Sequence, residues 1–247
     1  MANDALGQRI KANYEGPARH SLLRRTPVIV RLDGRAFHTF TRRLEKPFDA
    51  RLHTAMCQAA ICLGQDMQGC KLAYVQSDEA SFLLTDYDTL ETQPWFGYDQ
   101  SKVESISASV MTGAFARKCQ RYGIVDRATF DSRAFNIPRE EVANYFLWRA
   151  KDWYRNSVQM LARTHFSHNE LHGKKIPALH EMLHSIGINW ANLVGWHKNG
   201  TWINFALPEG DGQWQTSSCV RPRYAEIASL PPIKLAVGTD QQEESDE

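Results

Sequence analysis

The sequence has few cysteines, and they follow no recognisable framework. Five are scattered over 247 residues, and no two have the C-x-x-C spacing. An odd, dispersed set does not predict paired disulfides, and the missing spacing argues against a cysteine-ligated zinc site. We therefore expect reduced thiols that pack as small apolar side chains. They are Cys57, Cys62, Cys70, Cys119 and Cys219.

A long apolar run and an excess of one charge are also missing. No window approaches the roughly 20 apolar residues of a membrane span, and the N-terminus lacks the apolar segment of a signal peptide. Lys and Arg number 29 against 28 Asp and Glu, a net charge of +1. The charge balance alone does not indicate a nucleic-acid partner, although a local basic patch would still bind phosphates. These absences predict a cytoplasmic protein with no membrane contact.

Apolar spacing and turn residues predict seven elements before residue 165. Their order is strand, helix, strand, strand, helix, strand, followed by a last long helix. This is the split βαβ, ferredoxin-like arrangement of an α+β fold, with additional C-terminal helices and strands. The strands are expected at 27–33, 70–76, 79–85 and 128–137, and the helices at 49–67, 101–122 and 140–165.

The topology brings two aspartates together. In a split βαβ sheet the first two strands are parallel and the third lies between them, antiparallel to both. The end of the first strand, at Asp33, must therefore lie beside the turn between the next two strands, at Ser77 and Asp78. Paired carboxylates suit Mg²⁺, which keeps coordination positions free for phosphate oxygens. The alternative is that Asp33 with Gly34 is only a turn and Asp78 only a hairpin residue.

At these residues the sequence resembles the tRNA(His) guanylyltransferase superfamily. The resemblance rests on VRLDGRAFHTF (30–40), KPFD (46–49), QSDEASFLL (76–84) and FDSRAF (130–135), and on Trp148, Arg149, Asp152 and Asn156 as a WRxxDxxxN pattern. It extends from about residue 5 to about residue 205. The catalytic core of this family is similar to a polymerase palm. The resemblance thus implies a catalytic core at 1–137 and an RNA-contacting extension of the same domain at 138–235. The acidic composition of the chain's end predicts a disordered tail at 236–247.

The resemblance also implies a chemistry. ATP or GTP activates the 5′-monophosphate of a tRNA, and the 3′-hydroxyl of a nucleoside triphosphate then attacks it, so growth runs 3′ to 5′. The catalytic residues would be Asp33, Asp78 and Glu79, and two Mg²⁺ ions would bind Asp33, Gly34 and Asp78. The nucleotide would contact Asp33, Gly34, Arg35, Ala36, Phe37, His38, Lys46, Asp49, Ser77, Asp78 and Lys102.

Several of these residues have a simpler reading. Phe37 is more typical of a core than of a base-stacking site, and His38 could be a packing residue. Lys46 could be a solvated loop residue, and Glu79 could be a structural partner within the sheet. These alternatives stay open at the level of sequence.

One element departs from the family pattern. Members that add a single guanosine to tRNA(His) carry H-I-N-N in the helix after the fourth strand, where this chain has Tyr154, Arg155, Asn156 and Ser157. The difference favours the like-protein branch, which resembles template-directed polymerases that repair the 5′ ends of truncated tRNAs. A tRNA(His)-specific guanylyltransferase, another palm-type enzyme such as a nucleotide cyclase, and a catalytically silent RNA-binding module are the alternatives.

The sequence also leads to expectations about the RNA-binding face and the oligomeric state. Basic or polar side chains outside the core are candidates for tRNA contacts, and the resemblance implies a homotetramer. The candidates are Arg24, Arg25, Arg149, Asp152, Asn156, Lys174, Lys175 and Lys198.

Overall fold

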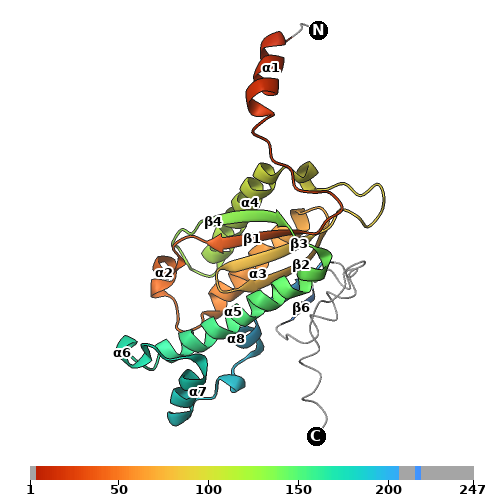
Figure 1. Cartoon of the computed structure of the whole chain (residues 1–247). Coiled ribbons are helices and arrows are strands. Elements are labelled where there is room, and N and C mark those ends of the chain that lie inside the picture. The colour runs from red at the N-terminus through yellow and green to blue at the C-terminus, as the bar shows by residue number, and fades with distance from the viewer. Residues whose placement is uncertain (1–3, 206–214, 218–247) are drawn as a thin grey trace.

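The computed structural model describes residues 4–205 and 215–217. A six-stranded antiparallel sheet lies at its centre, with the strand order β4-β1-β3-β2-β5-β6 (Figure 1). The strands are β1 (Val28–Gly34), β2 (Cys70–Gln76), β3 (Glu79–Leu84), β4 (Phe130–Asn136), β5 (Thr201–Asn204) and β6 (Gln215–Ser217). The predicted split βαβ order is confirmed, because β3 lies between β1 and β2 and pairs with both.

Helices cover both faces of this sheet. Figure 1 shows α3 and α4 behind it and α5 in front. The main helices are α3 (Ala50–Asp66), α4 (Gln100–Arg121) and α5 (Val142–Arg163), and the shorter ones are α1 (Ala5–Ile10), α2 (Phe37–Phe40), α6 (His168–Leu171), α7 (Ile176–Ser185) and α8 (Gly195–Asn199). A π-helix follows α1 at Lys11–Glu15, and 3-10 turns lie at Thr41–Arg43, Trp95–Tyr98, Arg139–Glu141 and Trp190–Asn192.

Both faces of the central strands are buried, and alternate residues point to different layers. Val28 and Val30 of β1 pack into the core formed with α3 and α4. Ile29, between them, packs with Val142 and Phe146 of α5. The first strand is therefore an apolar run from Val28 to Val30, continued by the buried Leu32, in which only Arg31 and Asp33 are partly exposed.

The C-terminal extension has its own small core and also returns to the sheet. Val158 and Leu161 of α5 pack with Leu179 and Leu183 of α7. Strand β5 then pairs with β2 as a further antiparallel strand. The predicted acidic tail, 236–247, and Cys219 lie outside the described residues. Within the described part, no helix is both long and apolar enough to cross a membrane.

Candidate active site

The two aspartates lie at one edge of the sheet. Asp33, near the end of β1, is opposite Glu79, the first residue of β3. Ser77 and Asp78 form the turn that precedes Glu79, and Ser77 adopts a left-handed φ of 49°. The backbone N–H of Gly34 donates to the carbonyl oxygen of Asp78 at 3.1 Å. The topology predicted this proximity, and the strand register produces it.

Both aspartates line one polar pocket of about 160 Å³. Helix α5 forms the opposite wall, so residues that the sequence suggested as RNA contacts lie beside the two aspartates. The lining residues are Asp33, Gln76, Ser77, Asp78, Glu79, Arg149, Asp152, Trp153 and Asn156.

Of the four carboxylates that line this pocket, Glu79 and Asp152 are ion-paired, whereas Asp33 and Asp78 are not paired within the described part of the chain. Burial raises the pKa of Asp78 to about 6, and the charges of Asp33 and Glu79 act in the same direction. Burial also raises the pKa of Asp33, and Asp131 adds to it, while the charges of Arg31, Arg133 and Arg149 act in the opposite direction. No described residue forms an ion pair with Asp33 or Asp78; the carboxylates in such pairs are those of other residues. The edge is therefore electrostatically prepared for a cation.

Asp131 is a part of this site that the sequence did not suggest. It lies on β4 directly opposite Asp33, and its charge contributes to the raised pKa of that residue. The FDSRAF segment is visible in the sequence, but the register of β4 against β1 decides which of its residues faces Asp33. Only the paired strands reveal it.

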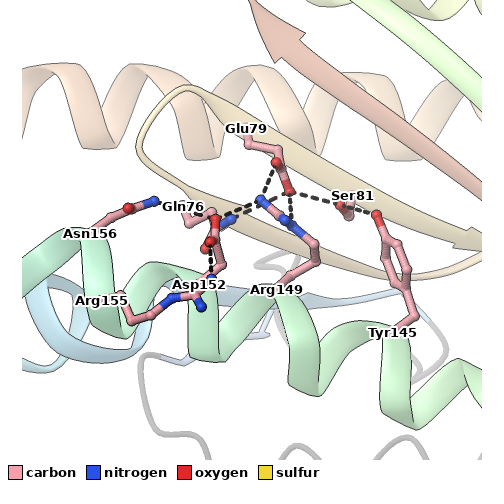
Figure 2. A network of polar contacts seen from close by, with 8 residues as sticks. All are labelled: Gln76, Glu79, Ser81, Tyr145, Arg149, Asp152, Arg155 and Asn156. Carbon is pink, nitrogen blue, oxygen red and sulfur yellow. Dashed lines mark hydrogen bonds and ion pairs between the residues drawn. The ribbon is translucent and has the colours of Figure 1, made fainter. Parts of the chain in front are cut away.

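Glu79 has a different environment from the two aspartates. Arg149 donates from Nε to Glu79 Oε1 at 2.7 Å and from Nη2 to Oε2 at 2.6 Å. Ser81 donates to the same carboxylate at 3.3 Å and is itself bonded to Tyr145. Figure 2 shows this network between β3 and α5. The alternative of a structural partner for Glu79 thus matches the observed contacts.

Asp152 extends the network towards the pocket. Its carboxylate accepts from Arg149 at 3.1 Å, from Arg155 at 2.7 Å and from Asn156 at 3.3 Å. Arg149 is only 7% exposed, so its guanidinium is taken up by carboxylates of the protein. Arg149 therefore lies within the wall of the pocket, and its RNA contact remains an untested prediction.

The segment that follows β1, residues 35–38, has one buried side chain and three exposed ones. Phe37 is buried, and its ring lies 5.0 Å from Phe40 and 5.4 Å from Phe130 between centroids. A Cβ on Gly34 would come within 2.2 Å of the Phe37 ring. The Phe37 ring therefore occupies the space that a side chain at position 34 would need. Arg35, Ala36 and His38 are exposed.

The other predicted nucleotide contacts are dispersed: Asp49 lines a pocket together with Gln76 and Ser77, whereas Lys102 lies in the first turn of α4, whose neighbours Gln100 and Glu104 are bonded to Ala134 of β4. Lys46 and Lys102 are exposed, and neither takes part in an ion pair with a described residue. Asp49, in contrast, is the N-cap of α3 and accepts from the backbone N–H groups of Arg51 and Leu52. Burial opposes ionisation, but these hydrogen bonds and the Arg51 guanidinium hold the pKa of Asp49 at about 2. Its carboxylate is therefore committed to the helix end.

Most of the remaining basic candidates have partners within the protein. Arg24 forms an ion pair with Asp86, whose carboxylate also accepts from the backbone of Arg25. Lys198 donates to a backbone carbonyl, that of Ala191. Lys174 and Lys175 are exposed, in the turn that leads into α7. Lys174 and Lys175 are thus basic candidates that are exposed and form no ion pair with a described residue.

Comparison with known proteins agrees with this geometry. Carboxylates that meet at one edge of a split βαβ sheet are typical of enzymes that transfer nucleotidyl groups, and the fold and the site point to the class of nucleotidyltransferases. Residues 7–138 match the family model described as tRNAHis guanylyltransferase (Thg1). This match covers more than half of the chain, and the protein belongs to the tRNAHis guanylyltransferase family.

Individual relatives extend the similarity to nearly the whole chain. The structure of a bacterial tRNA(His) guanylyltransferase (Thg1)-like protein in complex with ATP superimposes with a TM-score of 0.84 at 38% identity, covering 92% of this chain and 100% of the other. A GTP complex of such a protein gives 0.79 at 37% identity, with the same coverage. A probable tRNA(His) guanylyltransferase of Dictyostelium discoideum is 31% identical over 200 residues, covering 74% of this chain and 76% of that protein.

Proposed function

We propose that the protein adds nucleotides to the 5′ end of tRNA in the 3′–5′ direction, directed by the opposite strand, and thereby repairs truncated ends. The 5′-monophosphate is first activated with ATP or GTP. The observation that carries this proposal is the meeting of Asp33 and Asp78 at one sheet edge without a cationic partner. The ATP and GTP complexes of bacterial relatives at 38% and 37% identity support nucleoside triphosphates as substrates.

The donor set at this edge fits magnesium. Asp33 and Asp78 supply carboxylate oxygens, and the backbone at Gly34 lies beside them, which suits a hard cation that retains several waters. Within the described residues no three His, Cys, Asp or Glu side chains converge as a metal cluster, as expected for a site built from two carboxylates and a carbonyl. Two bound Mg²⁺ ions would activate the attacking hydroxyl and stabilise the leaving pyrophosphate.

Basic side chains outside the pocket would help to hold the substrate. Lys46 and Lys102, which the family resemblance assigns to nucleotide binding, are exposed and without an ion pair among the described residues, so their charge is available to neutralise a triphosphate. The Arg149–Glu79 pair fixes the β2–β3 hairpin against α5 and so holds the turn that carries Asp78. Charge that develops during phosphoryl transfer is best stabilised by groups that are already in place.

The helix element at residues 154–157 favours templated repair over addition of one guanosine. Tyr154 is hydrogen-bonded to His180 at 3.0 Å, and Ser157 accepts from the Trp190 indole at 2.9 Å. Both side chains are thus used for packing against the C-terminal extension. In this chain the element carries neither the histidine nor the second asparagine that the guanosine-adding members have, which supports a substrate choice by base pairing.

The test uses a 5′-monophosphorylated tRNA that lacks its first nucleotide. The protein is incubated with Mg²⁺, ATP and all four nucleoside triphosphates, and the opposing base is varied. We expect extension by the nucleotide complementary to that base, and its loss in Asp78→Asn. Asp66→Asn, an exposed aspartate at the end of α3, is the matched control. Addition of G regardless of the opposing base would instead support a tRNA(His) guanylyltransferase.

We also infer a homotetramer, which rests on the family resemblance. Light scattering of the purified protein measures its mass in solution. A mass of one chain at the concentrations used for the assay would refute the inference and leave the proposed chemistry untouched.

A further inference from the structure

A second surface pocket, of about 340 Å³, lies next to helix α2. Its walls come from the segment after β1, from the turn Thr41–Arg43, and from the loop between α4 and β4. Four arginines and a single acid supply its charges. The lining residues are Arg35, Ala36, Thr39, Phe40, Arg42, Arg43, Asp126 and Arg127.

The four arginines of this pocket are exposed and take part in none of the ion pairs within the described part of the chain. Other arginines of the protein are paired with carboxylates: Arg24 with Asp86, Arg51 with Asp49, and Arg149 with Glu79. Guanidinium groups gathered around one cavity repel one another unless an anion lies between them. Asp126 balances at most one of the four charges.

The backbone that carries these arginines is held in place. The N–H of Arg35 donates to the carbonyl of Thr129 at 2.9 Å, which ties the first wall to the loop of the second. Phe40, at the base of the pocket, is buried and its ring lies 5.7 Å from that of Phe115. The side chains can adapt to a ligand, whereas their anchor points are fixed by the core.

The pocket lined by the four arginines (the arginine pocket) is separate from the pocket lined by Asp33 and Asp78, although Arg35 is only two residues from Asp33 in the sequence. The two pockets share no lining residue, and Asp33 and Arg35 line different ones. The resemblance implies that Arg35 binds the nucleotide. In the structure Arg35 lines a pocket together with Arg42, Arg43 and Arg127.

We propose that the arginine pocket is a second anion site, which binds adjacent phosphate groups. Arginine presents a planar fork of donors that matches phosphate oxygens in pairs, and it stays charged at every physiological pH. A set of such groups around one cavity can engage neighbouring phosphates of a polyphosphate chain or of an RNA backbone. Both sources have the same chemistry, and the cavity accepts either.

The experiment measures binding of two probes in magnesium-free buffer, where the Asp33–Asp78 edge repels anions. Tripolyphosphate binding is followed by calorimetry, and binding of a short 5′-phosphorylated RNA hairpin by fluorescence anisotropy at several salt concentrations. The test variant is Arg42→Gln with Arg43→Gln. The matched control is Arg9→Gln with Lys11→Gln, which removes the same charge from the helical arm that Figure 1 shows projecting from the body.

The pocket variant should bind at least one probe about tenfold more weakly for each lost contact, relative to the control. Loss confined to tripolyphosphate assigns the site to free polyphosphate, and loss of hairpin binding with a shallower salt dependence assigns it to the RNA backbone. Arg127→Gln, from the other wall, must reproduce the effect. Equal binding of both probes by pocket variants and control would overturn the proposal, whether or not the protein extends tRNA.

Discussion

Arg149 and Glu79 join helix α5 to the edge of the sheet through two parallel hydrogen bonds of 2.7 and 2.6 Å. Each side chain is 9% exposed. A planar guanidinium that meets a carboxylate in this way fixes direction as well as distance. Glu79 directly follows Asp78, so the pair sets the position of the turn at which the two aspartates meet.

The two partners should differ in their effect when removed. Arg149→Leu leaves the Glu79 carboxylate buried and without its cation, and we expect a loss of about 3–5 kcal/mol in the free energy of unfolding. Glu79→Gln leaves Arg149 with Asp152, 3.1 Å away, and should lose about 1–2 kcal/mol. Urea unfolding of both variants, with the exposed Glu140→Gln as control, measures this. Equal losses would contradict the role of Asp152 as a second partner.

Asp78 should be unfavourable for stability when no metal is bound. Its pKa is raised from 3.8 to about 6 in the folded protein, so the ionised carboxylate destabilises the fold above pH 6. This effect fades as the pH falls from 6 to 4, where the folded protein takes up the proton first. Asp78→Asn should therefore raise stability at pH 7 in magnesium-free buffer by about 1–3 kcal/mol.

Magnesium should make the wild-type protein more stable than Asp78→Asn, the reverse of the order expected without metal. Thermal unfolding at pH 7 with and without Mg²⁺ is expected to show a gain for the wild-type protein and little for Asp78→Asn. The comparison separates a metal ligand from a carboxylate of purely structural importance. A variant that is less stable than wild type without metal would contradict the electrostatic account of this edge.

The two aspartates could be predicted from the sequence because their proximity follows from strand order alone. Short connections and apolar spacing specify that order, and no side-chain detail is needed. The Arg149–Glu79 pair could not be predicted, because it depends on how α5 docks across the sheet, some 70 residues along the chain. Arg149 was a candidate RNA contact as a basic residue, whereas the docked helix buries it.

The structural reason for a glycine at position 34 could not be predicted from the sequence either. Next to Asp33, a glycine suggests room for a ligand, yet the ring of Phe37 occupies the space that its Cβ would fill. Gly34→Ala should push this ring against Phe115 and Phe130, which lie 5.7 and 5.4 Å away between centroids. We expect a loss of about 1–3 kcal/mol from overpacking, measured by urea unfolding.

A second substitution identifies the cause of that loss. Phe37→Leu shortens the side chain that the new methyl group would meet. Gly34→Ala combined with Phe37→Leu should therefore be more stable than the sum of the two single effects predicts. Additive losses would mean that the strain arises in the backbone pairing of Gly34 with Phe130 rather than at the ring.

His53 provides a pH-dependent contribution from a pocket next to that of the two aspartates, with which it shares Gln76, Ser77 and Trp153. Its ring stacks on Trp196 at 4.1 Å and an interplanar angle of 8°, and Nε2 lies 3.0 Å from the Thr201 hydroxyl. Burial, reinforced by the nearby His197, lowers its pKa from 6.5 to about 4. The neutral ring is thus the form that fits between α3, α8 and β5.

Because folding lowers the pKa of His53, this residue makes the protein less stable as the pH falls. Between pH 6.5 and 4 the unfolded chain binds the proton and the folded chain does not, so stability falls as the pH is lowered through that range. Relative to His53→Phe, which keeps an aromatic ring but cannot titrate, the wild-type protein should lose about 2–3 kcal/mol between pH 7 and pH 4. Urea unfolding across that range tests this, with the exposed His38→Phe as control. A wild-type profile parallel to that of His53→Phe would show that folding does not lower the pKa of His53, and the stacked arrangement with Trp196 would then have to accept a charged imidazole below that pKa.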